Sequence, residues 1–509
     1  MRSSFRTETR HDRRVARALF ALALTVYAFF GQGCIRNTDG ATMAQVTAAM
    51  VDHRDLAVAP TLPGGDGLDG RHYSQYGLGT SLATVPLYLA GKAFYAAGGG
   101  RIPLDVATGF ALSWLNPLIG ALLVAAVFGL ARQIGVSLSG AVVAALVCGF
   151  ATNLTPHVKD LFSEPLTALC LAMAFREAWR AKERGPAAAA FCGLWWGAAF
   201  LTRAASMAAF PALMLLVVMR LPRPQRLAGA AGMAAACLPG IAIFAAYNVV
   251  RFGIWTETGY WSKPFLTPLL RGLSVDLASP ERGILWYSPA LLLVPLGVLA
   301  LRDGARAFTV AVAAFFVPHL LLYATFEDVF GGQSWGGRFM VPLLPLLCVF
   351  VGAAWQNLSV RARPWAVALL VLSAIVQFPA MYIHPGRYFT DLRIADAAGE
   401  VQTWPQRVRW SPLVHGWAYV PAATAALWHP DELRGLTARP VTRDDRELAA
   451  NSLYFRLPYI WWVMAAFSGA PPALCIGTGG LLLGAIAAAV LWLRRTLRVA
   501  GEPEVTLSL

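Results

Sequence analysis

The sequence predicts an all-α polytopic membrane protein with about twelve transmembrane helices and juxtamembrane helices in the first outer loop. Of its 509 residues, 57% are hydrophobic and only 14% are charged, and the mean hydropathy is +0.54. Apolar runs of roughly 17–25 residues, the length that crosses a bilayer, recur along almost the whole chain. Because lipid cannot satisfy free backbone groups, these runs are expected to be helices.

The strong apolar segments follow one another with short connections. They lie at 16–33, 77–97, 105–132, 138–154, 164–181, 186–203, 205–219, 227–250, 287–301, 307–325, 338–355, 364–383 and 473–493. A weaker, Trp-rich segment at 457–469 is too short for a span and is interpreted as interfacial.

The basic loops decide the topology. The N-terminus carries Arg10, Arg13, Arg14 and Arg17 and belongs in the cytoplasm. If 77–97 spans, the basic loops that follow all lie outside; if it lies along the outer surface, they all lie inside. The positive-inside rule therefore favours an interfacial helix at 77–97, and its sequence, broken by Gly79 and Pro86 and carrying Lys92, agrees.

This topology divides the chain into a sequence of parts with both termini in the cytoplasm. They are a basic tail (1–15), a transmembrane domain (16–383) with a first outer loop (34–104), an extracytoplasmic segment (384–472), a final span (473–493) and a second tail (494–509). The net charge of +14 is interpreted as a topology signal, not as a nucleic-acid surface. The seven cysteines show no paired spacing, so neither a disulfide framework nor a metal site is inferred.

The first outer loop contains a short amphipathic pattern that begins at Asp39. On spacing alone, Asp39 or Thr38 is expected to cap this helix, and the alternative is a carboxylate held just outside the membrane. Tyr73 and Tyr76 precede the interfacial helix. They are either interface anchors or contacts for a polar ligand.

A second outer stretch, "HVKDLFSEPL", lies at the mouth of two apolar segments. Ser163 suits an N-cap and Pro165 suits a first helical turn, so Glu164 gains from the helix dipole. Lys159 and Asp160 are expected to pair with each other. An acidic group at a span's outer mouth beside a lysine is nevertheless a candidate for function.

Several arginines lie on the outer side, against the positive-inside trend. Arg251, Arg282 and Arg338 each stand at a span end, and Arg203 ends another span. An anionic ligand such as a lipid phosphate would explain them, because guanidinium groups bind phosphate in a bidentate manner. Trp335 stands beside them in the glycine-rich stretch "GGQSWGGRF". The middle of no predicted span carries a charged residue, which argues against an ion-coupled transporter.

The order of these motifs resembles the GT-C superfamily of integral-membrane glycosyltransferases, in particular the protein O-mannosyltransferase and aminoarabinose transferase branch. The resemblance is carried by "TDGATMAQVTAAMVDHRDL", "DGRHYSQYGLGTSLATVPLYLAG", "KDLFSEPLTALCLAMAF", "AAFLTRAASMAAFPAL" and "GGQSWGGRFMVPLLPLL", and covers roughly 16–350. It implies transfer of a sugar from a polyprenyl-phosphate donor to a lipid, glycan or protein acceptor. The reaction would take place on the outer face of a bacterial cytoplasmic membrane.

The resemblance also implies roles for individual residues. Asp39 takes the place of the catalytic carboxylate, and Glu164 that of the second acid. The residues expected to bind substrate or phosphate are Lys159, Arg203, Arg251, Arg338, Tyr73, Tyr76 and Trp335. The family often has a second acid after the first, where this chain has Gly40, so no metal ligand is assigned, although a divalent metal is left open. The rival functions are a transporter or flippase of a lipid-linked glycan and a non-catalytic scaffold.

Overall fold

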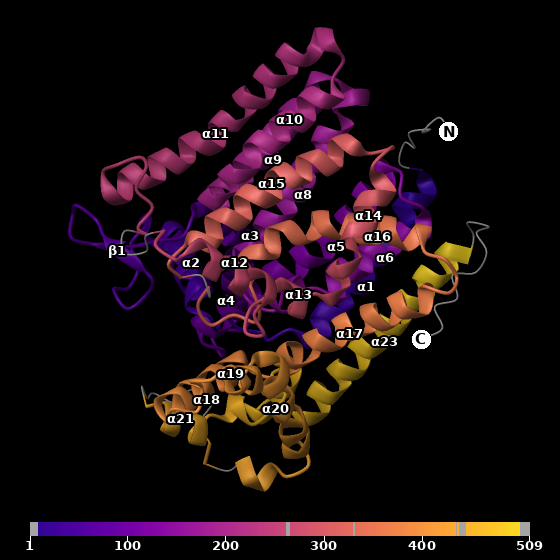
Figure 1. Cartoon of the computed structure of the whole chain (residues 1–509). Helices are drawn as coiled ribbons and strands as arrows, with labels where there is room; N and C mark the ends of the chain where they lie inside the picture. The colour runs from indigo at the N-terminus through magenta and orange to yellow at the C-terminus, as the bar shows by residue number, and fades with distance from the viewer. Residues whose placement is uncertain (1–8, 261–264, 329–330, 434, 437–443, 499–509) are drawn as a thin grey trace.

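A computed structural model describes residues 9–260, 265–328, 331–433, 435–436 and 444–498 of the chain. Its regular structure is helical apart from one short β-ribbon (Figure 1). The outer ends of the two predicted tails, 1–8 and 499–509, lie outside the described residues.

The helices of the first half begin and end close to the apolar segments that predict them. They are α1 (Arg10–Phe30), α2 (Thr38–Ala48), α3 (Leu78–Ala97), α4 (Leu104–Leu112), α5 (Leu115–Ile134), α6 (Leu138–Phe150), α7 (Leu154–His157), α8 (Glu164–Arg184), α9 (Pro186–Thr202), α10 (Phe210–Arg220) and α11 (Arg226–Phe252). The segment predicted as one run at 105–132 is two helices, α4 and α5, separated by Ser113 and Trp114.

The second half continues in the same way. Its helices are α12 (Leu269–Ala278), α13 (Ile284–Tyr287), α14 (Val294–Leu301), α15 (Arg306–Thr325), α16 (Leu344–Asn357), α17 (Arg363–Tyr382), α18 (Pro385–Ala397), α19 (Trp404–Arg409), α20 (Pro412–Ala426), α21 (Asp445–Asn451), α22 (Trp461–Phe467) and α23 (Pro472–Arg498). Short 3-10 turns precede α10, α14 and α16; the turn before α16 is η5 (Arg338–Leu343).

The helices suit a membrane by length and composition. Within the described residues, six helical stretches are long and apolar enough to cross a bilayer: Leu104–Ile134, Arg223–Phe252, Arg306–Thr325, Arg338–Asn357, Arg363–Tyr382 and Pro472–Arg498. Four shorter apolar stretches accompany them: Leu138–Phe150, Pro186–Thr202, Ala204–Arg220 and Pro289–Leu301. The fold is therefore that of an α-helical polytopic protein, and the count of about twelve spans stays a prediction.

The core of the bundle is formed by α5, α6, α8 and α16, most of whose residues are buried. These helices lie in the interior of the bundle (Figure 1). Helices α11 and α23 run along the periphery and expose apolar side chains such as Leu238 and Leu481. A contiguous apolar surface of this kind is characteristic of a membrane or protein contact. The arrangement is the one expected where lipid surrounds the bundle.

Helices α1 and α23 pack against each other in opposite directions. The short helix α22 anchors this pair: the Trp461 and Trp462 indole N–H groups donate to the carbonyls of Ala28 and Phe29 at the end of α1. Because α23 starts just after α22 and returns along α1, the beginning of α1 and the end of α23 lie at the same end of the bundle. This arrangement is compatible with two cytoplasmic termini.

The first predicted outer loop folds into α2, a π-helical turn (Ala49–His53), two strands and α3. Strands β1 (Gly64–Asp66) and β2 (His72–Ser74) are antiparallel and are not predicted by the sequence pattern. The helix predicted at 77–97 is present as α3 and continues through Pro86; its interfacial position stays a prediction. Lys92 and Tyr88 of α3 both reach the Asp52 carboxylate, at 2.6 Å each, and join α3 to the turn after α2.

The described part of 384–472 consists of short helices, α18 to α22, that lie together at one side of the bundle (Figure 1). Backbone hydrogen bonds attach the segment to the bundle. The Tyr459 amide donates to the Tyr382 carbonyl at 2.6 Å, and the Trp461 amide donates to the Gly31 carbonyl at 2.8 Å. The segment therefore touches both α17 and the chain that follows α1.

Candidate functional site

A cavity of about 1200 Å³ opens at the end of the bundle where the predicted outer loops meet. Its wall combines the start of α2, the turn before α3, the 156–163 stretch before α8, the chain after α9, the 331–339 loop and the start of α18. Segments that are hundreds of residues apart in sequence therefore contribute side chains to one space.

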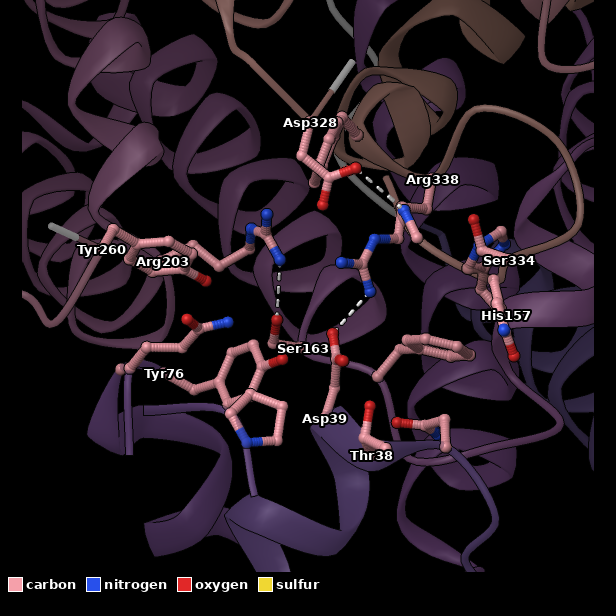
Figure 2. Close-up of a pocket in the computed structure, with 18 of the residues that line it drawn as sticks. Thr38, Asp39, Tyr76, His157, Ser163, Arg203, Tyr260, Asp328, Ser334 and Arg338 are labelled. Atoms are coloured by element: carbon pink, nitrogen blue, oxygen red, sulfur yellow. Dashed lines mark hydrogen bonds and ion pairs between the residues drawn. The ribbon is translucent and has the colours of Figure 1, made fainter. Parts of the chain in front are cut away.

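The first acid of the site is in the first turn of α2. The N-cap of this helix is Asn37, whose Oδ1 accepts the Gly40 amide at 2.5 Å. The expectation that Asp39 or Thr38 caps the helix is therefore wrong. With Asn37 as the cap, the Asp39 side chain projects into the cavity (Figure 2).

Asp39 faces Arg338, which begins the turn before α16. Arg338 Nη1 lies 2.5 Å from Asp39 Oδ2, and Figure 2 shows the two side chains pointing toward each other. Burial alone would raise the pKa of Asp39, but the charge of Arg338 and a hydrogen bond from the Tyr76 hydroxyl lower it below its ordinary value of 3.8. Asp39 is therefore an ionised carboxylate between a guanidinium and a phenol.

Glu164 forms the second ion pair. Its Oε1 accepts from Arg203 Nη1 at 2.7 Å and lies 3.7 Å from Arg338 Nε. Glu164 is 0% exposed and does not belong to the cavity wall, whereas both arginines do. Glu164 therefore stands behind the two guanidinium groups and fixes their position.

Ser163 precedes α8 but makes no capping hydrogen bond with its side chain. Its hydroxyl instead accepts from Arg203 Nη1 at 3.0 Å (Figure 2), and Arg203 Nη2 donates to the Tyr323 hydroxyl at 3.1 Å. Arg203 is held on three sides, by Glu164, Ser163 and Tyr323. The planar guanidinium group of Arg203 is therefore held in one orientation in the cavity wall.

Lys159 and Asp160 do not pair with each other as the sequence suggested. The Lys159 ammonium donates to the Met381 carbonyl at 2.6 Å. The Asp160 carboxylate accepts from the amides of Asn37 at 3.1 Å and Leu161 at 2.7 Å. Lys159 and Arg203 both line the cavity but have different partners, the Met381 carbonyl for Lys159 and Glu164 for Arg203.

Two other arginines singled out from the sequence, Arg251 and Arg282, donate hydrogen bonds to backbone carbonyls of nearby loops. Arg251 donates to the Ser74 carbonyl and, at 2.6 Å, to Asn248 Oδ1, so it joins the end of α11 to strand β2. Arg282 donates to the carbonyl of Ser334 and, at 2.6 Å, to that of Gly332. It therefore shapes the glycine-rich loop that leads to Arg338.

Of the three aromatic residues predicted to bind substrate, two line the cavity and one does not. Tyr76 and Trp335 line the cavity, and the indole ring of Trp335 packs edge-on against Tyr287 at 5.8 Å. Tyr73 is not among the residues of the cavity wall, and its hydroxyl donates to Asp69 Oδ2 at 2.8 Å. The structure thus brings Tyr76 and Trp335, but not Tyr73, to the site.

Sequence reasoning missed Arg36, Tyr260, Tyr323 and His384, all of which line the cavity. His384 lies near Arg36 and Lys159, whereas Tyr323 contacts Arg203 and Tyr260 lies near it (Figure 2). No local motif marks these residues. Arg36, Tyr260 and His384 lie in predicted outer loops, and this location is the one signal that could have selected them.

The donor set at Asp39 and Glu164 does not fit a divalent cation. Each carboxylate faces an arginine, and among the described residues no three His, Cys, Asp or Glu side chains gather as a metal site. The position after Asp39 also excludes a second acid. A Cβ at Gly40 would lie 2.6 Å from the Leu161 carbonyl oxygen and 2.9 Å from the Ile35 side chain.

The fold is similar to that of solved membrane proteins. ArnT from Cupriavidus metallidurans in the apo state matches with a TM-score of 0.51 and 15% identity, covering 86% of this chain and 84% of its own. The chain has the fold of this ArnT structure. The fold expected from the sequence resemblance is thus confirmed.

Two further matches are weaker. The undecaprenyl-phosphate-bound form of the same ArnT has a TM-score of 0.48 at 15% identity, with 86% of this chain and 84% of the other covered. The archaeal oligosaccharyltransferase AglB from Archaeoglobus fulgidus, in complex with an inhibitory peptide and a dolichol-phosphate, has a TM-score of 0.46 at 11% identity, with 77% and 59% covered. No family model and no curated protein sequence matches the chain.

Proposed function

We propose that the protein is an inverting membrane glycosyltransferase. It moves a sugar from a polyprenyl-phosphate donor to a lipid, glycan or protein acceptor on the outer face of the bacterial cytoplasmic membrane. The observation that carries this proposal is the Asp39–Arg338 pair, joined to Arg203 and Glu164, in the wall of a large cavity in a GT-C fold. A carboxylate beside two guanidinium groups supplies what this reaction needs: a proton acceptor and stabilisation for a leaving phosphate.

The proposed reaction begins at Asp39. Its ionised carboxylate accepts the proton of the acceptor hydroxyl as that oxygen attacks the anomeric carbon. The bond from the anomeric carbon to the phosphate oxygen breaks, and polyprenyl phosphate leaves with the bonding electron pair. Attack opposite the leaving group inverts the anomeric centre.

Arg338 and Arg203 stabilise the charge that develops on the leaving phosphate. In the ligand-free site each guanidinium contacts a carboxylate, at 2.5 Å for Asp39 and 2.7 Å for Glu164. A donor phosphate competes with Asp39 for Arg338, and this exchange frees the carboxylate as a base. Fixed donors of this kind act most strongly where water is excluded.

The remaining wall residues have supporting roles in the proposal. Burial, with the nearby Asp39 charge, raises the pKa of Tyr76, so its hydroxyl stays a hydrogen-bond donor to Asp39. Glu164 positions the two arginines, and Arg251 fixes the backbone of the first loop near Ser74. Trp335 offers an aromatic face for a sugar ring.

A transfer assay tests the proposal. The protein in detergent is supplied with polyprenyl-phosphate sugars and an envelope extract, and release of polyprenyl phosphate is followed by mass spectrometry. A glycosyltransferase releases polyprenyl phosphate without any membrane compartment, and Asp39→Asn abolishes the release. A transporter or flippase leaves the donor intact in detergent, and a scaffold tolerates Asp39→Asn in cells.

Envelope glycans provide the second readout. Cells that lack the protein should lose one sugar mass from an envelope component, and the wild-type chain, but not Asp39→Asn at equal protein level, should restore it. An unchanged glycan profile together with no donor cleavage would reject the proposed function.

A further inference from the structure

A second group of polar side chains lines the same cavity where the 384–472 segment joins its wall. It consists of Arg36, Lys159 and His384, with Tyr454 and Tyr459 of the 384–472 segment packed against them. Arg36 comes directly before α2, Lys159 before α8 and His384 before α18. Three remote parts of the chain thus meet around the Tyr459 ring.

The Arg36 guanidinium is held in one orientation. Its Nε donates to the Tyr459 hydroxyl at 2.8 Å and contacts Cys34 Sγ at 3.2 Å, while its plane lies 4.0 Å from the centre of the Tyr454 ring. These contacts use the inner edge and one face of the group. No hydrogen bond of either Nη atom is found among the described residues, and such a fork matches phosphate oxygens.

Lys159 is the second cation. It is 4% exposed and lines the cavity, and its ammonium lies 5.2 Å from the centre of the Tyr459 ring. Among the described residues only the Met381 carbonyl, at 2.6 Å, accepts from its three N–H donors. Burial lowers the pKa of Lys159 to about 7, although the charge of Asp160 opposes this shift. An anion bound beside Lys159 would favour the protonated ammonium and accept from the remaining donors.

Two groups of residues in the cavity wall differ in their ion pairs. In one group, Arg203 and Arg338 are matched by Glu164 and Asp39. In the other, Arg36 and Lys159 have no carboxylate within 4.0 Å among the described residues.

One carboxylate opposes this charge in part. The Asp160 carboxylate lines the cavity, acts on Lys159 through its charge and accepts from the amides of Asn37 and Leu161. His384 accepts the Gly386 amide at 2.9 Å, and burial lowers its pKa to about 3, so it is neutral. Two basic side chains, Arg36 and Lys159, therefore stand against one carboxylate in this part of the cavity.

We infer that Arg36 and Lys159, oriented by Tyr454 and Tyr459, form a second phosphate-binding subsite, and that the 384–472 segment is part of the substrate-binding machinery. This inference rests on the proposed function for the nature of the ligand, a phosphate ester. The phosphate belongs either to the polyprenyl donor or to an anionic acceptor. The shared chemistry is one phosphate against two basic side chains.

Binding measurements with two probes separate these sources. Undecaprenyl phosphate in nanodiscs stands for the donor, with uncharged undecaprenol as its matched control, and glucose 1-phosphate in solution stands for a soluble anionic acceptor. The variants are Arg36→Gln, Lys159→Met and Tyr459→Phe. Arg71→Gln is the control, because Arg71 is exposed and pairs with Asp55 and Asp69 away from the cavity.

The expected result is a loss of affinity of roughly tenfold or more for a phosphate probe in Arg36→Gln and Lys159→Met, as for a lost charge-assisted hydrogen bond. Undecaprenol binding and the Arg71→Gln control should not change. Tyr459→Phe should give a smaller loss, because the ring remains but the Arg36 Nε partner is removed. A loss of affinity for undecaprenyl phosphate assigns the subsite to the donor. A loss of affinity for glucose 1-phosphate assigns it to the acceptor.

The inference is overturned if the wild-type protein binds neither phosphate probe, or if folded Arg36→Gln binds both as well as wild type. Size-exclusion profiles establish folding, and Arg36→Gln decides alone if Lys159→Met does not fold, since Arg36 is only half-buried. The binding assay needs no turnover. A failed transferase proposal and a failed subsite are therefore seen in different experiments.

Discussion

Arg338 and Asp39 are separated by 299 residues, and the Arg338 Nη1 atom lies 2.5 Å from Asp39 Oδ2. This ion pair joins the first loop of the chain to the turn before α16. Both partners line the cavity, so the same contact shapes the site and supplies its charge.

A double-mutant cycle should detect this pair. Asp39→Asn and Arg338→Gln should each destabilise the protein, and the double variant should lose less than the sum, with a coupling of about 1–3 kcal/mol for contacting residues. Unfolding in SDS of all four proteins measures the coupling. The exposed pair Arg71–Asp69 is the control and should couple by less than about 1 kcal/mol. Additive effects at Asp39 and Arg338 would contradict the observed contact.

Glu164→Gln should weaken function through the arginines. The substitution keeps the shape but removes the charge that opposes Arg203, and breaking one side of a buried pair costs about 3–5 kcal/mol. We expect a lower melting temperature, and a raised KM for the lipid-linked donor more than a lowered kcat. Adding Arg203→Gln should recover part of the stability. A normal KM in Glu164→Gln would contradict a positioning role.

Arg282→Lys should loosen the glycine-rich loop before Arg338. A lysine cannot donate to the carbonyls of Ser334 and Gly332 with a planar fork. Faster proteolysis of the loop and a donor KM raised roughly tenfold are expected, as for one or two lost charged hydrogen bonds. Arg302→Lys, at an exposed position, is the control and should behave as wild type.

Gly40→Ala should destabilise the protein because the new Cβ would lie 2.6 Å from the Leu161 carbonyl oxygen. Overpacking of this kind costs about 1–3 kcal/mol. Gly109→Ala in α4 is a matched control, since no atom lies within 4 Å of a Cβ there. Melting temperatures of the two variants check this, and equal values would show that α2 can move away from the 160–163 stretch.

The contribution of Asp39 to stability should depend on pH in a defined direction. Its pKa is lower in the folded chain than the ordinary 3.8, so ionised Asp39 favours the folded state above that value. The contribution is lost as the pH falls through the folded pKa. The stability difference between wild type and Asp39→Asn should therefore be constant from about pH 5 to pH 8 and shrink only below about pH 4. A difference that changes near pH 6 would contradict the lowered pKa.

Much of the fold could be predicted because hydrophobic length determines where a membrane helix lies. The apolar run at 307–325 matches α15, and that at 364–383 matches α17, within one residue at each end. The break between α4 and α5 and the ribbon at β1 and β2 could not be predicted. Neither changes the apolar pattern enough to be seen without tertiary contacts.

Part of the candidate site could be predicted because charged residues are rare in this chain and stand out beside apolar segments. Glu164, Arg203 and Arg338 stand at the ends of apolar runs, and Asp39 lies in the outer loop after the first run, where charges are conspicuous. Which of them pair depends on how the helices pack, so the spacing pointed to the wrong cap for α2 and to a Lys159–Asp160 pair that is not formed. Arg36 was missed because its partners, Tyr454 and Tyr459, come from the other end of the chain.

The hydrogen bond from the Trp461 amide to the Gly31 carbonyl, at 2.8 Å, has a consequence for biosynthesis. Residue 31 leaves the ribosome early and residue 461 near the end of translation. The cavity wall at Arg36 is therefore completed only after nearly the whole chain has been inserted. A chain that stops after α17 would contain Asp39, Glu164, Arg203 and Arg338 but would leave the end of α1 uncovered, and we expect membrane proteases to recognise it as unfinished.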